Sequence, residues 1–330
     1  MSEQTVSSSS ISQTPEEKPD SSPADGRRRG SAIKALVLLV VFVLGGGGGY
    51  VMGRHSLSAA PTSEDQSQKH AMTSMEQVNP PDGYEIPAVF GDVGLQLVAS
   101  GAIDLAKFTA LYRQQNKPLS DDQMALLTKE TVAKVVINPQ NATFLLNFFW
   151  ALGLANQNDI LSEGPMMAGG RDKVGGFAST GGWTLGAKKP VEIYASTKVI
   201  TMTDEQQARL VEVAAGVYRP CCDNPTHFPD CNHGMAMLGL LELMASQNAS
   251  TDEMFTAAKY VNAFWYPQQI LEVAAAFKAT KNVDFAEADA REVVSSQFSS
   301  ISGFRAVHQW LSQNGLLEQA PSSGGSCGVQ

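Results

Sequence analysis

One uninterrupted apolar stretch near the N-terminus constrains this chain more than any other feature. The 21 residues Ala32–Met52 contain a single charged side chain, Lys34. A helix of that length would extend about 31 Å, which matches the hydrocarbon thickness of a bilayer. The sequence therefore predicts one transmembrane helix, in residues 31–53, and a lipid bilayer as a partner.

The charges on either side of this stretch predict its orientation. Arg27, Arg28 and Arg29 precede it, whereas only Arg54 and a titratable His55 follow it closely. Because positive charge is retained on the cytoplasmic side, we expect a cytoplasmic N-terminus and an extracytoplasmic main domain, periplasmic if the host is bacterial. A cleaved signal peptide is the alternative, since the small residues 58–60 follow the apolar stretch. The uncleaved anchor is favoured because the stretch exceeds the apolar core of about 7–15 residues found in signal peptides.

Composition divides the rest of the chain. Residues 1–30 are rich in serine, proline and charge and predict a disordered tail, residues 54–81 a flexible linker, and residues 318–330 a flexible Gly/Ser tail. Residues 82–317 are long enough for one globular domain. The chain has 24 basic and 33 acidic residues and a net charge of −9. This balance argues against nucleic acid as a partner.

Helical signals dominate residues 82–317, and we expect a mainly α fold. Capping-box patterns open helices at Ser120, Thr203 and Ser250. Two further segments are apolar all round and predict buried helices, at residues 141–153 and 233–247. The remaining helical patterns lie at residues 103–114, 268–278, 286–298 and 304–311.

Two segments depart from the helical pattern. Residues 164–186 contain eight glycines, too many for a helix interior, and predict an extended, irregular loop. Val191–Met202 is rich in β-branched residues and predicts one or two short strands. The glycines match neither the phosphate-binding nor the dinucleotide-binding spacing, so no nucleotide cofactor is expected.

The chemistry is concentrated in Tyr218–Gly234, which reads YRPCCDNPTHFPDCNHG and holds three of the four cysteines. The prolines keep this segment out of a continuous helix, and Cys231 falls where the buried helix begins. Unpaired amides at a helix N-terminus favour a thiolate. We therefore predict a metal site for Zn or Cu formed by the cluster Cys221, Cys222, Cys231 and His233. The accessory candidates are His227, Met235, Met237 and Cys327.

Two alternatives use the same cysteines. In an oxidising compartment they would pair as structural disulfides, and the protein would be an envelope scaffold or interaction module for another envelope protein. As a redox protein, the chain would exchange disulfides, with Cys327 as a resolving thiol. No C-x-x-C-H motif occurs, so c-type haem is not expected. Hydrolysis through Cys231 and His233 is not indicated, because no orienting partner is identifiable.

Two other titratable residues carry weaker signals. Glu242 is the only acidic residue of the buried helix, and we expect it to pair with a distant arginine such as Arg219 rather than to act as a catalytic acid. His308, beside Trp310, is expected to be a packed or surface histidine.

Overall fold

The computed structural model describes residues 75–317, all of which belong to one compact unit. The predicted tail at 1–30, the transmembrane helix at 31–53, most of the linker and the tail at 318–330 lie outside the described residues. Within 75–317, no helix combines the length and the apolar composition needed to cross a bilayer.

Residues 75–79 pack onto the rest of the domain. Residues 75–78 form a helical turn, and Val78 is completely buried. Asn79 donates its side-chain amide to the carbonyl of Ala263, 3.1 Å away. These contacts attach residues 75–79 to the domain.

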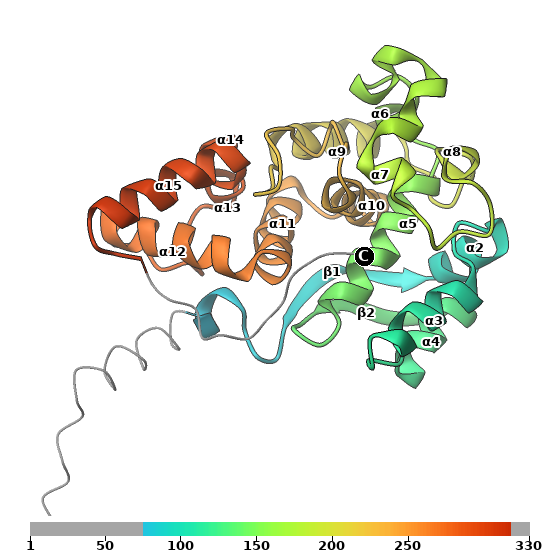
Figure 1. Cartoon of the computed structure of the whole chain (residues 1–330), viewed down its shortest axis with the longest axis horizontal. Coiled ribbons are helices and arrows are strands. Elements are labelled where there is room, and N and C mark those ends of the chain that lie inside the picture. The colour runs from blue at the N-terminus through green and yellow to red at the C-terminus, as the bar shows by residue number, and fades with distance from the viewer. Residues whose placement is uncertain (1–74, 318–330) are drawn as a thin grey trace, which may run out of the picture. The chain divides into compact units, whose positions relative to one another are not determined.

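The described chain is mainly α-helical, as predicted (Figure 1). Its elements in chain order are β1 (Tyr84–Gly91), α2 (Val93–Ser100), α3 (Leu105–Gln114), α4 (Asp121–Thr128), β2 (Thr131–Ile137), α5 (Ala142–Ala155), α6 (Asp159–Ser162), η1 (Pro165–Gly169), η2 (Arg171–Gly176), α7 (Ala178–Gly181), α8 (Pro190–Ile193), α9 (Asp204–Gly216), α10 (Asn232–Ser246), α11 (Thr251–Trp265), α12 (Pro267–Lys281), α13 (Ala290–Val293), α14 (Ser296–Ser299) and α15 (Ile301–Gln313). The three predicted capping boxes are present at the starts of α4, α9 and α11.

The core is organised around two buried helices, α5 and α10, which lie side by side (Figure 1). Both are buried on almost every face, as their apolar sequences predict. They approach closely at Gly153 and Gly239, where an added Cβ on either residue would overlap the backbone of the other helix. This contact fixes α10, and therefore Cys231 at its start, against the centre of the domain.

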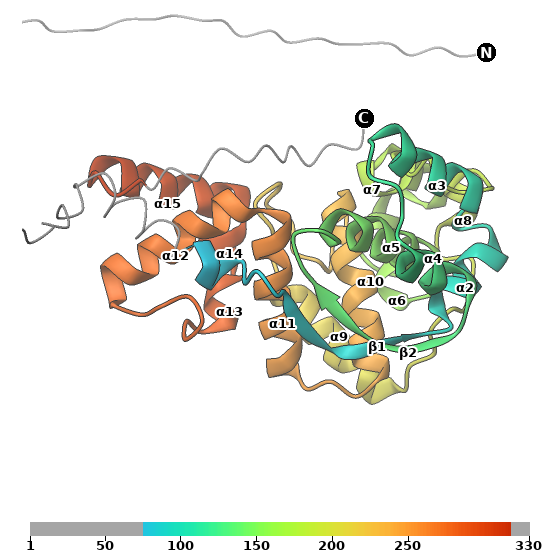
Figure 2. The ribbon, with the colours of Figure 1, turned by 90° about the horizontal axis from the view of Figure 1, so that it is seen from below.

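The strands are not where the sequence analysis placed them. Val191–Met202 forms α8 and an irregular segment with one isolated bridge, between Asn156 and Thr197. The observed strands β1 and β2 pair antiparallel, and Figure 2 shows them crossing beside α11 and α10. The register shifts between Ile86 and Val89, at Pro87, because proline has no amide hydrogen for the ladder.

Two other segments differ from their predicted structure. The glycine-rich segment 164–186 is not extended: it folds into the short helical turns η1, η2 and α7, each ending after four to six residues. The pattern at 286–298 is not one helix but two short ones, α13 and α14, separated by Val294 and Ser295. Short turns tolerate the Gly and Ser residues that would destabilise a long helix interior.

Candidate metal centre

The cysteine loop, residues 217–231, connects α9 to α10. The Thr226 amide donates to the carbonyl of Val217 at 2.8 Å, and the Thr226 hydroxyl donates to the same carbonyl at 3.0 Å. These two bonds close the loop at its base. They return the chain to α10, so that residues distant in sequence face one another.

Cys231 is the N-cap of α10. Its Sγ accepts a hydrogen bond from the amide of Gly234 at 3.4 Å. A sulfur at this position faces the positive end of the helix dipole, which favours the thiolate over the thiol. The predicted placement of Cys231 at the head of a central helix is therefore confirmed.

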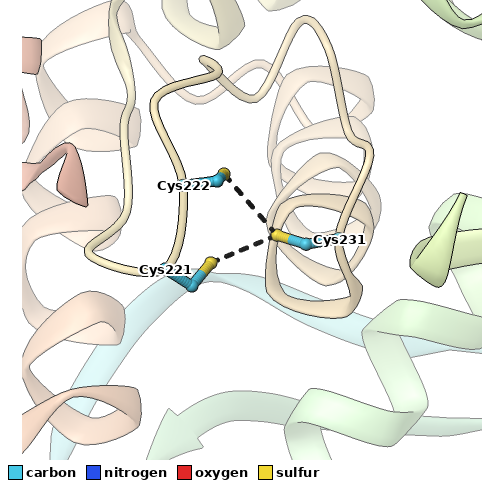
Figure 3. A group of neighbouring side chains, drawn as sticks. All are labelled: Cys221, Cys222 and Cys231. Carbon is cyan, nitrogen blue, oxygen red and sulfur yellow. Dashed lines mark hydrogen bonds between the residues drawn. The ribbon is translucent and has the colours of Figure 1, made fainter. Parts of the chain in front are cut away.

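The other two cysteines of the loop point towards Cys231 (Figure 3). The Cys221 sulfur lies 3.2 Å from that of Cys231, and the Cys222 sulfur lies 3.9 Å from it. All three sulfurs lie within 4.8 Å of one another. They are free thiols, and Cys221 is exposed whereas the other two are half-buried.

Arg219 provides a positive charge next to the sulfurs. Its side chain is almost fully buried, and its Nε donates to Cys231 Sγ at 3.1 Å. The remaining guanidinium nitrogens donate to the carbonyls of Asn224 and Phe228 and pair with Asp230, the last at 2.8 Å. Asp230 also accepts from the Asn224 side-chain amide, 2.8 Å away. The guanidinium is thus held in place by the loop.

Gly234 provides the space that Arg219 occupies. A Cβ at position 234 would overlap the guanidinium of Arg219. The glycine three residues after Cys231 therefore allows an arginine to lie under the start of α10, in contact with the cysteine that caps it.

Hydrogen bonds divide the charge unequally among the three sulfurs. Bonds from Cys221 and Cys222, followed by the charge of Arg219, hold the pKa of the Cys231 thiol well below its ordinary value. Cys222 lowers the pKa of Cys221, but the bond to Cys231 and burial outweigh this and raise it to about 11. The bonds to Cys221 and then Cys231 also raise the pKa of Cys222. These interactions favour the thiolate at Cys231 and the thiol at Cys221 and Cys222.

The cysteine loop is fixed from two sides. The glycine-rich segment contacts it through Ser179, whose amide donates to the carbonyl of Asp230 at 3.1 Å, and through Phe177, whose ring lies edge-on to Phe228. On the other side, the amide of Ile301 donates to the carbonyl of Cys222 at 3.0 Å.

Asp223 adds to the contact with α15. Its carboxylate accepts from both the amide and the hydroxyl of Ser302, at 2.9 and 2.8 Å. These bonds hold the pKa of Asp223 below its ordinary value. Residues 222 and 223 of the cysteine loop are therefore both attached to the start of α15.

His233, the fourth predicted ligand, does not belong to the group of converging ligand atoms, which consists of Cys221, Cys222 and Cys231. Its ring is buried against Trp265 and Tyr266, with centroids 5.8 and 4.6 Å away. Burial lowers its pKa to about 4, so the imidazole is neutral at neutral pH. Its Nε2 atom is buried without a hydrogen-bond partner.

The residues predicted as accessory metal ligands lie in different parts of the chain. Met235 and Met237 are buried in the core along α10. His227 is half-buried in the cysteine loop and is outside the group of three sulfurs. Cys327 lies outside the described residues.

The sequence context of Tyr266, an aromatic run before a proline, predicts only core packing. It is indeed mostly buried, and its hydroxyl interacts with Cys221 but has no hydrogen-bond partner of normal geometry. Burial, followed by the charges of Cys221 and Cys231, raises its pKa well above the ordinary value. The phenol is therefore protonated and can donate a hydrogen bond at the site.

The predicted pairing of Glu242 with Arg219 is not observed, because Arg219 binds within the cysteine loop. Glu242 is completely buried on α10, and neither carboxyl oxygen has a hydrogen-bond partner of normal geometry. Burial raises its pKa well above the ordinary value, so the group is uncharged at neutral pH. His308 is half-exposed and pairs with Glu272, with Nδ1 2.7 Å from Oε2.

The sulfur geometry is close to that of a bound metal. Tetrahedral Zn–S bonds of about 2.3 Å place neighbouring sulfurs about 3.8 Å apart. The 3.9 Å separation of Cys222 and Cys231 already fits, and Cys221 must move away from Cys231 by about 0.6 Å to reach that spacing. An all-sulfur set of this kind favours soft or borderline ions such as Cu(I) and Zn(II).

A separate groove of about 580 Å³ lies between α4, β2 and the start of α5. Phe90 and Phe144 contribute to its floor, and Asp122 and Lys134 contribute to its lining. None of the residues of the cysteine loop lines it. The cysteine cluster therefore lies outside this groove.

Comparison with known proteins does not assign the chain to a family. No family model, curated protein or solved structure matches it.

Proposed function

We propose that this chain is a membrane-anchored, extracytoplasmic protein that binds a soft or borderline metal ion, Zn(II) or Cu(I), through Cys221, Cys222 and Cys231. The observation that carries the proposal is the convergence of three free thiols within 4.8 Å of one another. Thiolates are the ligands that such ions prefer. The anchor and its orientation rest on the sequence of residues 27–55 alone.

The surroundings of the sulfurs support this proposal. Metal binding needs deprotonated thiols, and Arg219 offsets part of the negative charge that three thiolates would bring together. The loop is already closed by Thr226 and attached to α15 through Asp223. The ligands are therefore held near their bound positions before an ion arrives, which lowers the entropy lost on binding.

Metal content measured on the full-length chain tests the proposal. Protein purified without oxygen is incubated with Zn(II) or Cu(I), freed of excess ion and analysed for metal and for free thiols. We expect one ion per chain in the wild type and none retained by Cys231→Ser. A Ser246→Ala variant, altered at the far end of α10, should bind as the wild type does. Absence of bound ion in the wild type, or full occupancy in Cys231→Ser, would refute metal binding at these cysteines.

Thiol–disulfide exchange is a second candidate function, favoured by the 3.2 Å distance between the sulfurs of Cys221 and Cys231. The Cys231 thiolate would attack a substrate disulfide and release one substrate thiol. Cys221 would then attack the Cys231 sulfur, release the second substrate thiol and leave a Cys221–Cys231 disulfide, so that the two cysteines supply both electrons. Metal-free protein should then reduce insulin, and Cys221→Ser should accumulate the mixed disulfide. Without insulin reduction, this candidate is excluded.

A further inference from the structure

The proposed centre has one ligand fewer than a divalent ion of the zinc class requires. Among residues 75–317, the group that contains the cluster consists of three sulfurs only. Zn(II) in proteins is almost always four-coordinate, and sites with three protein ligands take the fourth from solvent or a substrate. What occupies the fourth position is a question that rests on the proposed function.

The nearest other donors are already engaged or buried elsewhere. The Asp230 carboxylate pairs with Arg219 and accepts from Asn224. The His233 ring packs on Trp265 and Tyr266. A fourth ligand that leaves these interactions intact must therefore come from outside the described fold.

One side of the cluster is suited to receive such a ligand. Cys221 is exposed, so the sulfurs are reachable from solvent. Tyr266 is 8% exposed, and its hydroxyl faces the cluster at Cys221 without a hydrogen-bond partner of normal geometry. A buried hydroxyl without a partner is unfavourable, and a ligand that accepts its hydrogen would remove that penalty.

Positive groups beside the sulfurs offset part of the negative charge that three thiolates and an anionic fourth ligand would bring together. The guanidinium of Arg219 lies 3.1 Å from Cys231 Sγ, and the N-terminus of α10 adds a partial positive charge. A neutral phenol at this position acts as a hydrogen-bond donor, which suits an acceptor. We propose that a divalent ion held by the three cysteines keeps one coordination position for a small exogenous anion, a hydroxide or a low-molecular-weight thiolate, that accepts a hydrogen bond from Tyr266 Oη.

Cobalt(II) provides the test, because its visible spectrum reports its ligands, whereas Zn(II) has no visible spectrum. The full-length chain is loaded with cobalt, and azide or 2-mercaptoethanol is added as the probe anion. We expect each probe to change the spectrum saturably. We expect Tyr266→Phe to bind cobalt as the wild type does but to require about ten- to hundredfold more azide, the loss expected for one hydrogen bond to a charged acceptor. This variant removes a single hydroxyl and keeps the aromatic ring, so the fold should persist.

The outcomes separate this inference from metal binding itself. If the chain takes up no cobalt, the metal site is refuted and the inference with it. If cobalt binds but neither probe alters the spectrum, or if Tyr266→Phe binds azide as tightly as the wild type, metal binding stands and the inference is wrong. The same conclusion follows if azide binds only to Cys327→Ser, because Cys327 would then occupy the fourth position in the wild type.

Discussion

The Arg219 guanidinium lies against the Cys231 sulfur, with Nε 3.1 Å from Sγ, although the two residues belong to opposite ends of the cysteine loop. Arginine remains protonated at every physiological pH, so this contact places a permanent positive charge beside the sulfur that caps α10. The contact links the reactivity of the cluster to the shape of the loop, because the loop carbonyls and Asp230 hold the guanidinium.

Replacing Arg219 should therefore raise the pKa of Cys231. We predict that Arg219→Gln moves the midpoint pH for alkylation of Cys231 upward by about 1 to 2 pH units, since a charge-assisted hydrogen bond contributes about 1.5–3 kcal/mol and one pKa unit is about 1.4 kcal/mol. Arg219→Lys, which keeps the charge but not the fork geometry, should show a smaller shift. Iodoacetamide labelling of reduced, metal-free protein, followed by peptide mass spectrometry, measures the midpoint. An unchanged midpoint in a folded Arg219→Gln would contradict the role assigned to this contact.

A substitution at Gly234 should also raise the pKa of Cys231, independently of any change at Arg219. We predict that Gly234→Ala displaces the guanidinium and raises the alkylation midpoint of Cys231 without removing any charged group, because a Cβ there would overlap Arg219. It should also lower the free energy of unfolding by about 1–3 kcal/mol, the usual effect of overpacking. Gly176→Ala is the matched control, since a Cβ at 176 meets no atom within 4 Å. Equal midpoints in the two variants would show that Arg219 does not depend on this space.

Local sequence signals accounted for most of the helices. The capping boxes at Ser120, Thr203 and Ser250 rely on contacts three residues apart, and an all-round apolar helix such as α5 has only a buried position available. The β1–β2 pair was not predicted, because Pro87 interrupts one strand and because exposed Val132 and Lys134 disturb the alternation of apolar and polar residues in the other. Its stability comes from pairing between distant segments, which no local window contains.

The candidate site also has features that the local sequence predicts and features that depend on distant contacts. Convergence of the three cysteines follows from a proline-rich loop that ends at a helix start, and this was predictable. The roles of Arg219, Asp230 and Tyr266 were not, because they depend on how the loop closes and on where α11 ends. The packing of the His233 ring on Trp265 and Tyr266 was not predictable either, because the spacing C-x-H does not show which neighbours pack on the ring.

His233 can be tested directly as a ligand. We predict that His233→Phe retains one metal ion per chain, because its ring packs on Trp265 and Tyr266 and is outside the group of three sulfurs. Phenylalanine preserves that aromatic packing and cannot bind a metal. Metal content and affinity measured beside Cys231→Ser decide the question. A loss of metal comparable to that in Cys231→Ser would restore His233 to the ligand set.

Glu242 should make the stability of the domain fall as pH rises. Its pKa in the folded state is raised well above its ordinary value of 4.5 by burial, so the folded state holds a proton that the unfolded state releases above about pH 4.5. The contribution of Glu242 to the free energy of unfolding is complete below that pH and is lost as pH rises towards the folded pKa. The loss is about 1.4 kcal/mol for each pH unit between the unfolded and the folded pKa.

We predict that Glu242→Gln removes this dependence, because glutamine keeps the shape of the protonated acid and does not titrate. Urea unfolding followed by circular dichroism at several pH values between 5 and 8 measures the free energy of unfolding of both proteins. The variant should be the more stable of the two at pH 8, and the difference should shrink towards pH 5. Glu163→Gln, at an exposed position beyond α6, controls for the loss of one negative charge and should leave the pH dependence as in the wild type. Parallel curves for wild type and Glu242→Gln would mean that the buried carboxyl has the same pKa in the folded and the unfolded protein, which would contradict the effect assigned to burial.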